Sequence, residues 1–148
     1  MAFIFNSQIC TTLKQSKKLI ELGLNPETAD MSYSVLVSDF KGNTIPKKDH
    51  LYTLSTSYST SYMHVGLEKR EIIPAWSLSR LIEMLPPYIS SMDAVIVINK
   101  DGVSYESDYI SGDSKYFQED YGLFQNLIDC IEWLIKEGKL KTYLNEEA

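Results

Sequence analysis

The hydrophobic positions between Tyr121 and Gly138 follow the spacing of an amphipathic helix. Six large apolar residues share one face of a 3.6-residue period: Leu123, Leu127, Ile128, Ile131, Leu134 and Ile135. The opposite face carries polar residues: Gln125, Asn126, Asp129, Glu132 and Lys136. Gly138 supplies the residue with positive φ that ends many helices. The pattern predicts a long C-terminal helix whose apolar face lies in the main core.

Two further helices are predicted earlier in the chain. The first covers about Ser7–Leu22, with Asn6 or Ser7 as its N-cap and Gly23 at its end. A short helix follows Ser77 and ends before Pro86, because the two successive prolines there cannot continue it.

Alternating and continuous apolar runs predict strands between these helices. Met31–Phe40 alternates as a strand does, and Leu51–Ser57 is a second, weaker pattern. The uninterrupted run Ala94–Ile98 predicts a central strand that is buried on both faces. A turn at Asn99–Gly102 joins it to a returning strand over residues 103–110, so this region is predicted to be a hairpin.

The order of these elements predicts an α+β fold. Strands that are grouped into hairpins favour an antiparallel sheet packed against helices, with the C-terminal helix central to the core. The 148 residues match the size of one ordinary domain, and no linker divides them. We therefore expect a single domain over residues 1–148.

Charge and composition narrow the classes of partner. The net charge is −6, and residues 101–148 hold four lysines against eleven acidic residues. Phosphate backbones repel such a chain, so we expect no nucleic-acid partner. No apolar run approaches the roughly 18 residues of a membrane helix, so no membrane partner is expected either. The start of the chain lacks the basic segment of a signal peptide, and Cys10 and Cys130 share no metal or redox spacing. These features predict a reduced, cytoplasmic location.

No motif for catalysis or for cofactor binding stands out. Cys130 falls on the apolar face of the predicted helix, which indicates a buried structural thiol. His50 and His64 are isolated in sequence, and a catalytic role would require the fold to bring partners to them. Glu106 and Asp108 could offer oxygen ligands to a hard cation, but the spacing of a calcium-binding loop is missing. We therefore expect neither a cofactor nor a metal.

A segment rich in tyrosine, serine and threonine is the most suggestive binding feature. Tyr52, Tyr58 and Tyr62 lie in it, and tyrosine combined with serine is typical of adaptable protein-recognition surfaces. An edge strand with inward tyrosines and outward hydroxyls would produce the same pattern. The candidate partner-binding residues are these tyrosines together with three carboxylates of the acidic third: Glu106, Asp108 and Asp113.

Three stretches carry a resemblance to other proteins. Gln15–Tyr33, Ile73–Pro86 and Glu132–Leu140 resemble a group of short uncharacterised proteins encoded on phages and other mobile elements of gut bacteria. The resemblance implies a mobile-element setting, and it implies no activity and no functional residue.

Together these observations predict a small non-enzymatic accessory protein that acts by protein–protein binding. In the setting that the resemblance implies, it would be a host-modulating factor. The alternative is a small enzyme whose dispersed His, Asp and Glu residues come together only in the folded chain.

Overall fold

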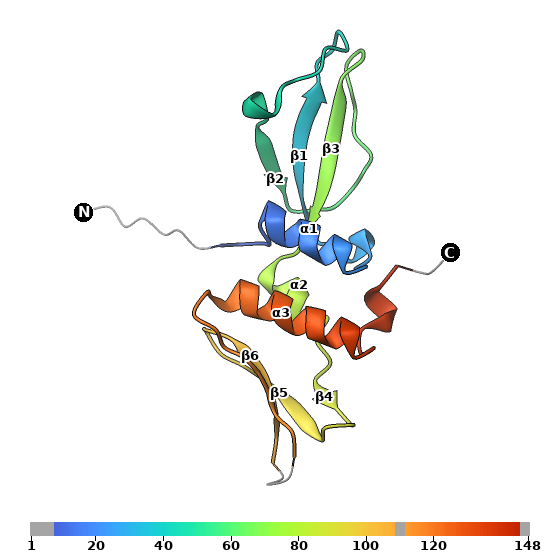
Figure 1. Cartoon of the computed structure of the whole chain (residues 1–148). Helices are drawn as coiled ribbons and strands as arrows, with labels where there is room; N and C mark the ends of the chain where they lie inside the picture. Colours follow the sequence, from blue (N-terminus) through green and yellow to red (C-terminus); the bar gives the residue numbers. More distant parts are fainter. Residues whose placement is uncertain (1–7, 109–111, 146–148) are drawn as a thin grey trace, which may run out of the picture. The chain divides into compact units, whose positions relative to one another are not determined.

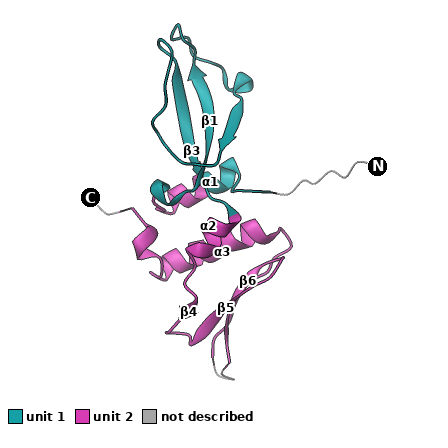
Figure 2. Cartoon of the chain, turned by 180° about the vertical axis from the view of Figure 1, so that it is seen from behind, with its two compact units in different colours: residues 1–16, 26–77 teal, residues 17–25, 78–148 magenta. Residues whose placement is uncertain are grey.

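The computed structural model describes residues 8–108 and 112–145, which fall into two compact units. Unit 1 comprises residues 1–16 and 26–77, and unit 2 comprises residues 17–25 and 78–148 (Figure 2). Helices and antiparallel sheets occur together, which confirms the predicted α+β class. The chain passes between the units three times, so neither unit is one continuous segment.

Unit 1 is built on a three-stranded antiparallel sheet in the order β2-β1-β3 (Figure 1). The elements are η1 (Pro26–Thr28), β1 (Met31–Ser38), η2 (Lys47–Asp49), β2 (Tyr52–Ser55) and β3 (Lys69–Ala75). In the central strand, Tyr33 lies opposite Leu54 on one side and Ile73 on the other. The strands predicted over Met31–Phe40 and Leu51–Ser57 are thus confirmed in position, whereas β3 was not predicted.

The first helix, α1 (Leu13–Glu21), begins later than the sequence pattern predicts. Cys10 instead forms an antiparallel bridge with Ser77, so the chain before the helix is extended. The helix begins after Thr12, whose Oγ1 accepts the Gln15 N–H at 3.1 Å while Gln15 Oε1 accepts the Thr12 N–H at 3.0 Å. This reciprocal pair is a capping box, and it fixes the first turn. The expected caps, Asn6 and Ser7, lie outside the described residues.

Both predicted glycine stops are confirmed. The Gly23 N–H donates to the Ile20 carbonyl at 3.0 Å, and the Leu24 N–H donates to the Leu19 carbonyl at 3.1 Å. These two bonds form a Schellman motif, which requires a positive φ at the glycine, here +96°. Gly138 ends the C-terminal helix in the same way, with φ at +70°.

Unit 2 combines a four-stranded antiparallel sheet, in the order β4-β5-β6-β7, with helices on one side of it (Figure 1). Its elements are α2 (Leu78–Glu83), β4 (Tyr88–Ile89), β5 (Ala94–Ile98), β6 (Val103–Ser107), β7 (Lys115–Phe117), α3 (Leu123–Lys136) and η3 (Lys141–Tyr143). Strands β5 and β6 confirm the predicted hairpin. Its expected last residues, 109 and 110, lie outside the described part of the chain.

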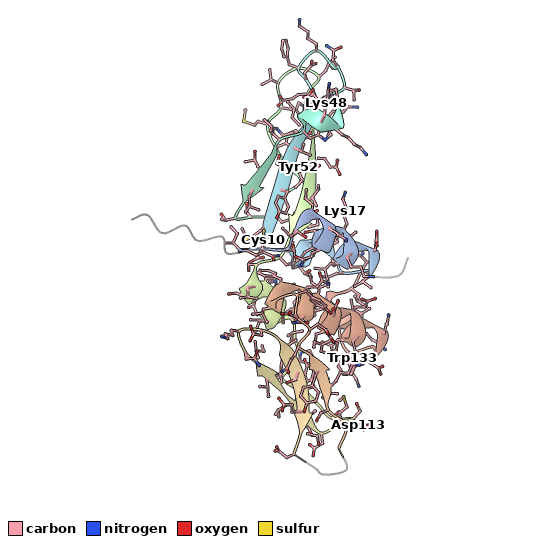
Figure 3. The ribbon with its side chains drawn as sticks, turned by 60° about the vertical axis from the view of Figure 1, so that its left-hand side comes forward. Cys10, Lys17, Lys48, Tyr52, Asp113 and Trp133 are labelled. Carbon is pink, nitrogen blue, oxygen red and sulfur yellow. The ribbon has the colours of Figure 1, made fainter. Side chains whose placement is uncertain are left out.

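Helix α3 is central to the core of unit 2, as predicted. Leu127, Ile131 and Leu134 on its apolar face are fully buried, and the helix packs on β6 and β7 and contacts α2. On the side facing the sheet, the Trp133 ring lies 6.0 Å from the Tyr105 ring and 5.7 Å from the Phe117 ring (Figure 3). This aromatic cluster joins the helix to two neighbouring strands.

One residue assigned to the polar face of α3 is in fact buried. Asn126 is fully buried, and its side-chain amide makes three hydrogen bonds to backbone groups. Nδ2 donates to the carbonyls of Asp101 at 2.7 Å and Glu119 at 3.0 Å, and Oδ1 accepts the Glu119 N–H at 3.1 Å. The amide therefore ties the β5–β6 turn to the segment that leads into α3.

Strand β5 is interior in the sheet but is not buried on both faces. Val95 is 49% exposed and Val97 is 39% exposed, whereas Ala94 between the sheet and the helices is fully buried. The prediction of two buried faces is wrong, because α2 and α3 cover only one side of this sheet (Figure 2).

Candidate functional site

The three candidate tyrosines are all in unit 1, but they differ in environment. Tyr52 begins β2 and is 45% exposed, with its ring edge-on to His50 at 6.5 Å (Figure 3). Tyr62 is 36% exposed, and its hydroxyl oxygen accepts the backbone N–H of Arg70 at 3.0 Å. Tyr58 is half-buried and lines a hollow of about 330 Å³ with Glu27, Ser59 and Thr60.

The fold does not bring these tyrosines into one patch. After β2, residues 56–66 pass the end of the sheet to its opposite edge, where they run beside β3 (Figure 1, Figure 2). Tyr58 and Tyr62 belong to this segment, whereas Tyr52 lies in β2, which forms the other edge of the sheet. Tyr62 thus helps to hold the segment against β3, in addition to presenting part of its ring to solvent.

The three candidate carboxylates belong to unit 2. Asp108 and Asp113 are exposed. Glu106 is half-buried, and its Oε2 accepts the Ser104 hydroxyl at 2.7 Å. It lies opposite Val95 in the sheet register, so it shares the face of the sheet that the helices leave uncovered. The candidate tyrosines therefore all belong to unit 1, and the candidate carboxylates all belong to unit 2.

Each histidine contacts a neighbouring group in its own segment, and Cys130 is buried. His50 Nε2 lies 2.9 Å from the Ile45 carbonyl oxygen, and the His64 ring is edge-on to Tyr62 at 5.7 Å. Cys130 is fully buried, as predicted, and burial raises the pKa of its thiol to about 12, so it stays protonated at neutral pH. Within residues 8–108 and 112–145, no three His, Cys, Asp or Glu side chains are grouped so as to hold a metal ion.

An exposed apolar group at the end of the unit 1 sheet was not predicted from the sequence. We call it the loop patch, and it consists of Phe40, Met63, Val65 and Leu67, which are 59%, 98%, 68% and 65% exposed. Its two halves are adjacent in space, because the Leu67 N–H donates to the Phe40 carbonyl at 2.9 Å. Contiguous exposed apolar patches often mark interaction sites on a folded protein.

Local turn chemistry holds the first half of the loop patch. Asp39 Oδ1 accepts the backbone N–H groups of Lys41 at 3.0 Å and Asn43 at 2.9 Å, and Gly42 takes a φ of +85°. This arrangement closes a tight turn after β1 and leaves the Phe40 ring at its edge, with the Lys41 ammonium 5.7 Å from the ring centroid. The patch therefore sits on an ordered turn.

The second half of the loop patch is fixed to the same turn. A Cβ placed on Gly66 would lie 2.6 Å from the Phe40 carbonyl oxygen, which shows how closely the two backbones approach. The Leu67 side chain similarly lies 3.2 Å from the Cβ position of Gly42. Glycine at these two places lets the loops meet, and their apolar side chains are displayed together as a result.

Net charge is divided unequally between the units. Unit 1 holds six Lys and Arg residues and six Asp and Glu residues, so its net charge is zero. Unit 2 holds eight Lys and Arg residues and fourteen Asp and Glu residues, so it carries the entire −6. The apolar loop patch therefore belongs to a neutral unit and the candidate carboxylates to a strongly acidic one.

No helix in the described part of the chain is both long and apolar enough to cross a membrane. Comparison with protein-family models, curated proteins and solved structures found no match to this chain.

Proposed function

We propose that this chain is a small accessory protein that acts by binding another protein through the loop patch. The observation that carries the proposal is the exposure of four large apolar side chains on two ordered loops that are hydrogen-bonded to each other. Protein-binding surfaces combine apolar and aromatic contacts at their centre with a polar rim. Lys41, whose ammonium lies 5.7 Å from the Phe40 ring centroid, is a charged group at the edge of the patch.

The size of the loop patch suits a partner that binds and is released. Complete burial of its four side chains would contribute about 6–12 kcal/mol at about 1.5–3 kcal/mol each. Association itself costs about 4–15 kcal/mol, so the patch alone supports moderate affinity at most. Tyr62 directly precedes Met63 in the chain, and its partly exposed ring could add a contact beside the patch.

The negative charge of unit 2 would add long-range electrostatic attraction to the encounter with the proposed partner. A charge of −6 confined to one unit attracts partners with a basic surface and speeds their approach. In the mobile-element setting that the sequence resemblance implies, such a partner would be a protein of the host cell, and the chain would modulate it.

Capture from a lysate of the cells that encode the protein, followed by mass spectrometry, tests the proposal. The variant Met63→Asp/Val65→Asp places two charges in the loop patch, where both side chains are exposed and the fold should tolerate them. We expect this variant to capture at most about one tenth as much of the partner as the wild type does. A loss of about 1.4 kcal/mol in binding free energy lowers the affinity about tenfold.

The matched control is Ile9→Asp, which charges another exposed apolar residue of unit 1, 60% exposed, outside the loop patch. This control should retain the partner as the wild type does. Equal retention by the double variant and the control would contradict the assignment of the loop patch. Turnover of a substrate by the purified chain, with no partner captured, would instead support the enzyme alternative.

A further inference from the structure

The four edge strands in the described sheets are not equally protected against pairing with another strand. Free sheet edges expose unpaired backbone N–H and C=O groups, and proteins usually shorten such edges, charge them or interrupt them with proline. In unit 2, β4 has two residues and follows Pro86-Pro87, and β7 has three residues and begins with Lys115. Both of these edges are too short or too charged to extend the sheet easily.

In unit 1, the outer edge of β3 is protected in several ways. Pro74 has no backbone N–H, and the strand carries Lys69, Arg70 and Glu71. Residues 56–66 run beside this strand, and the Tyr62 hydroxyl takes the Arg70 N–H (Figure 1). The chain thus covers this edge with its own backbone and side chains.

The outer edge of β2 has none of these protections. All four residues of β2, Tyr52–Ser55, are exposed, and none is charged or a proline. No described segment of unit 1 runs along the outer side of β2 in either view (Figure 1, Figure 2). This edge therefore presents backbone hydrogen-bonding groups next to two partly exposed apolar side chains, Tyr52 at 45% and Leu54 at 37%.

We propose that β2 pairs antiparallel with β2 of a second copy of this chain, so that two three-stranded sheets join into one of six strands. A two-fold axis perpendicular to the sheet keeps each residue on its own face, and it places Thr53 opposite Thr53 of the second copy. Tyr52 then lies opposite Leu54 of the second copy, and the same pair occurs again on the other side of the axis. Thr–Thr pairs are among the favourable cross-strand neighbours, and the Tyr52 ring and the Leu54 side chain would bury apolar surface against each other.

The charge of unit 1 does not oppose a second copy as the occupant of this edge, and the sequence of β2 is complementary to itself. Like charges oppose the association of identical surfaces, but unit 1 has zero net charge and β2 has no ionisable group other than the Tyr52 phenol. The sequence of β2 is complementary to itself because Tyr52 of each copy pairs with Leu54 of the other and Thr53 pairs with Thr53. The pairing uses side chains other than those of the loop patch, and the inference does not depend on the proposed partner.

The expected dimer is weak. Four-residue strands bury far less than the roughly 1,200–2,000 Å² of a stable interface, even with Leu51, which is 84% exposed, added at each end. We therefore expect a monomer–dimer equilibrium with a dissociation constant of about 10 µM to 1 mM. Sedimentation velocity over that concentration range should show the 16.9 kDa chain shifting toward twice its mass.

Charge substitutions at Thr53 test the pairing and its register together. Thr53→Lys and Thr53→Glu each place like charges directly opposite one another across the two-fold axis, so each variant alone should stay monomeric at concentrations where the wild type dimerises. An equimolar mixture of the two variants places Lys opposite Glu and should form the dimer again. The recovery also shows that both variants are folded.

Thr60→Lys is the matched control, because it makes the same change at an exposed threonine in the segment beside β3. It should dimerise as the wild type does. The proposal is overturned if the wild type remains monomeric up to about 1 mM, or if Thr53→Lys dimerises as strongly as the control. It is also overturned if the mixture of Lys and Glu variants stays monomeric while circular dichroism shows both to be folded.

Discussion

At the scale of single residues, Asn126 shows where periodicity stops being informative. Its position in the helical pattern predicts a solvent-facing side chain, yet the amide is fully buried. The reason is that its three hydrogen-bonding partners are backbone groups of Asp101 and Glu119, which only the folded chain brings to it. A single sequence contains no signal for such partners, because they lie 7 and 25 residues away.

Asn126→Ala should destabilise the protein by about 2–4 kcal/mol, because it leaves buried backbone groups of Asp101 and Glu119 without partners. Urea unfolding monitored by circular dichroism measures the loss. Gln125→Ala changes the adjacent, half-buried amide and should lower the free energy of unfolding by less than about 1 kcal/mol. Equal losses in the two variants would show that the hydrogen bonds of Asn126 contribute nothing of their own.

Glu132 gives the stability of unit 2 a dependence on pH. Partial burial alone would raise the pKa of its carboxyl, but the ammonium groups of Lys136 at 3.3 Å and Lys18 at 3.4 Å lower it on balance. A lowered folded-state pKa stabilises the protein above the unfolded value, near 4.5, and this contribution is lost as the pH falls through the folded pKa.

Glu132→Gln should therefore be less stable than the wild type at pH 7, and the difference should shrink below about pH 4.5. Denaturant unfolding at pH 7 and at pH 3 measures both differences. Glu137→Gln, an exposed position farther along the chain, is the control. A difference between Glu132→Gln and the wild type that stays constant with pH would show that the two lysines do not act on this carboxylate.

At the scale of elements, the sequence predicted best where a pattern is local. Helix α3, the β5–β6 hairpin and both glycine stops depend on residues within a few positions of one another, and all were found as predicted. Strand β3 was missed because its residues follow no clear alternation and contain Pro74. The start of α1 was misplaced because apolar residues before Thr12 continue the helical spacing, although they belong to an extended segment that bridges to Ser77.

Thr12→Ala tests the corrected start of α1. It removes the hydroxyl that accepts the Gln15 N–H, so the first turn should lose about 0.5–2 kcal/mol of stability. Hydrogen exchange should show faster exchange at residues 14–16 with little change in α3. Lys14→Ala, an exposed change in the same turn, is expected to leave exchange unaltered. If Thr12→Ala exchanges as Lys14→Ala does, the capping box does not hold the helix start.

The loop patch was not predicted from the sequence. Tyr52 and Tyr62 are partly exposed and stay candidate binding residues, but the four apolar residues of the loop patch were not singled out. They lie in turns and in the irregular stretch before β3, where apolar residues have no period. Such residues are buried in some proteins and exposed in others, and only the contacts of the folded chain decide between the two.

At the scale of the whole molecule, connectivity bears on the expected single domain. The chain passes between the two units after residues 16, 25 and 77, so neither unit can be cut out as one segment. Helix α1 contributes residues to both units. Loss of structure in one unit therefore disrupts segments that belong to the other, and this coupling favours cooperative unfolding.

Calorimetry should accordingly show one transition whose calorimetric and van't Hoff enthalpies agree. Ile131→Ala truncates the core of unit 2 and should cost about 2–5 kcal/mol. In a cooperative molecule it lowers the melting temperature of unit 1 signals, such as the fluorescence of Trp76, as much as that of unit 2 signals. Two separate transitions, with only one shifted by Ile131→Ala, would contradict a single domain.

Association with a protein partner should depend on salt through the acidic unit 2. Glu106→Gln, Asp108→Asn and Asp113→Asn together change the net charge from −6 to −3, which weakens long-range attraction to a basic partner. The association rate measured by surface plasmon resonance with the captured partner should fall, and added salt should mimic this effect by screening over about 8–10 Å.

Tyr62→Ala should instead speed dissociation from the partner, because a ring that contacts the partner stabilises the complex after the encounter. Tyr58→Ala should do so less, since that ring is already half-buried within unit 1. An association rate that ignores both salt and the triple substitution would mean that the acidic surface is merely solvated and that the partner is recognised by unit 1 alone.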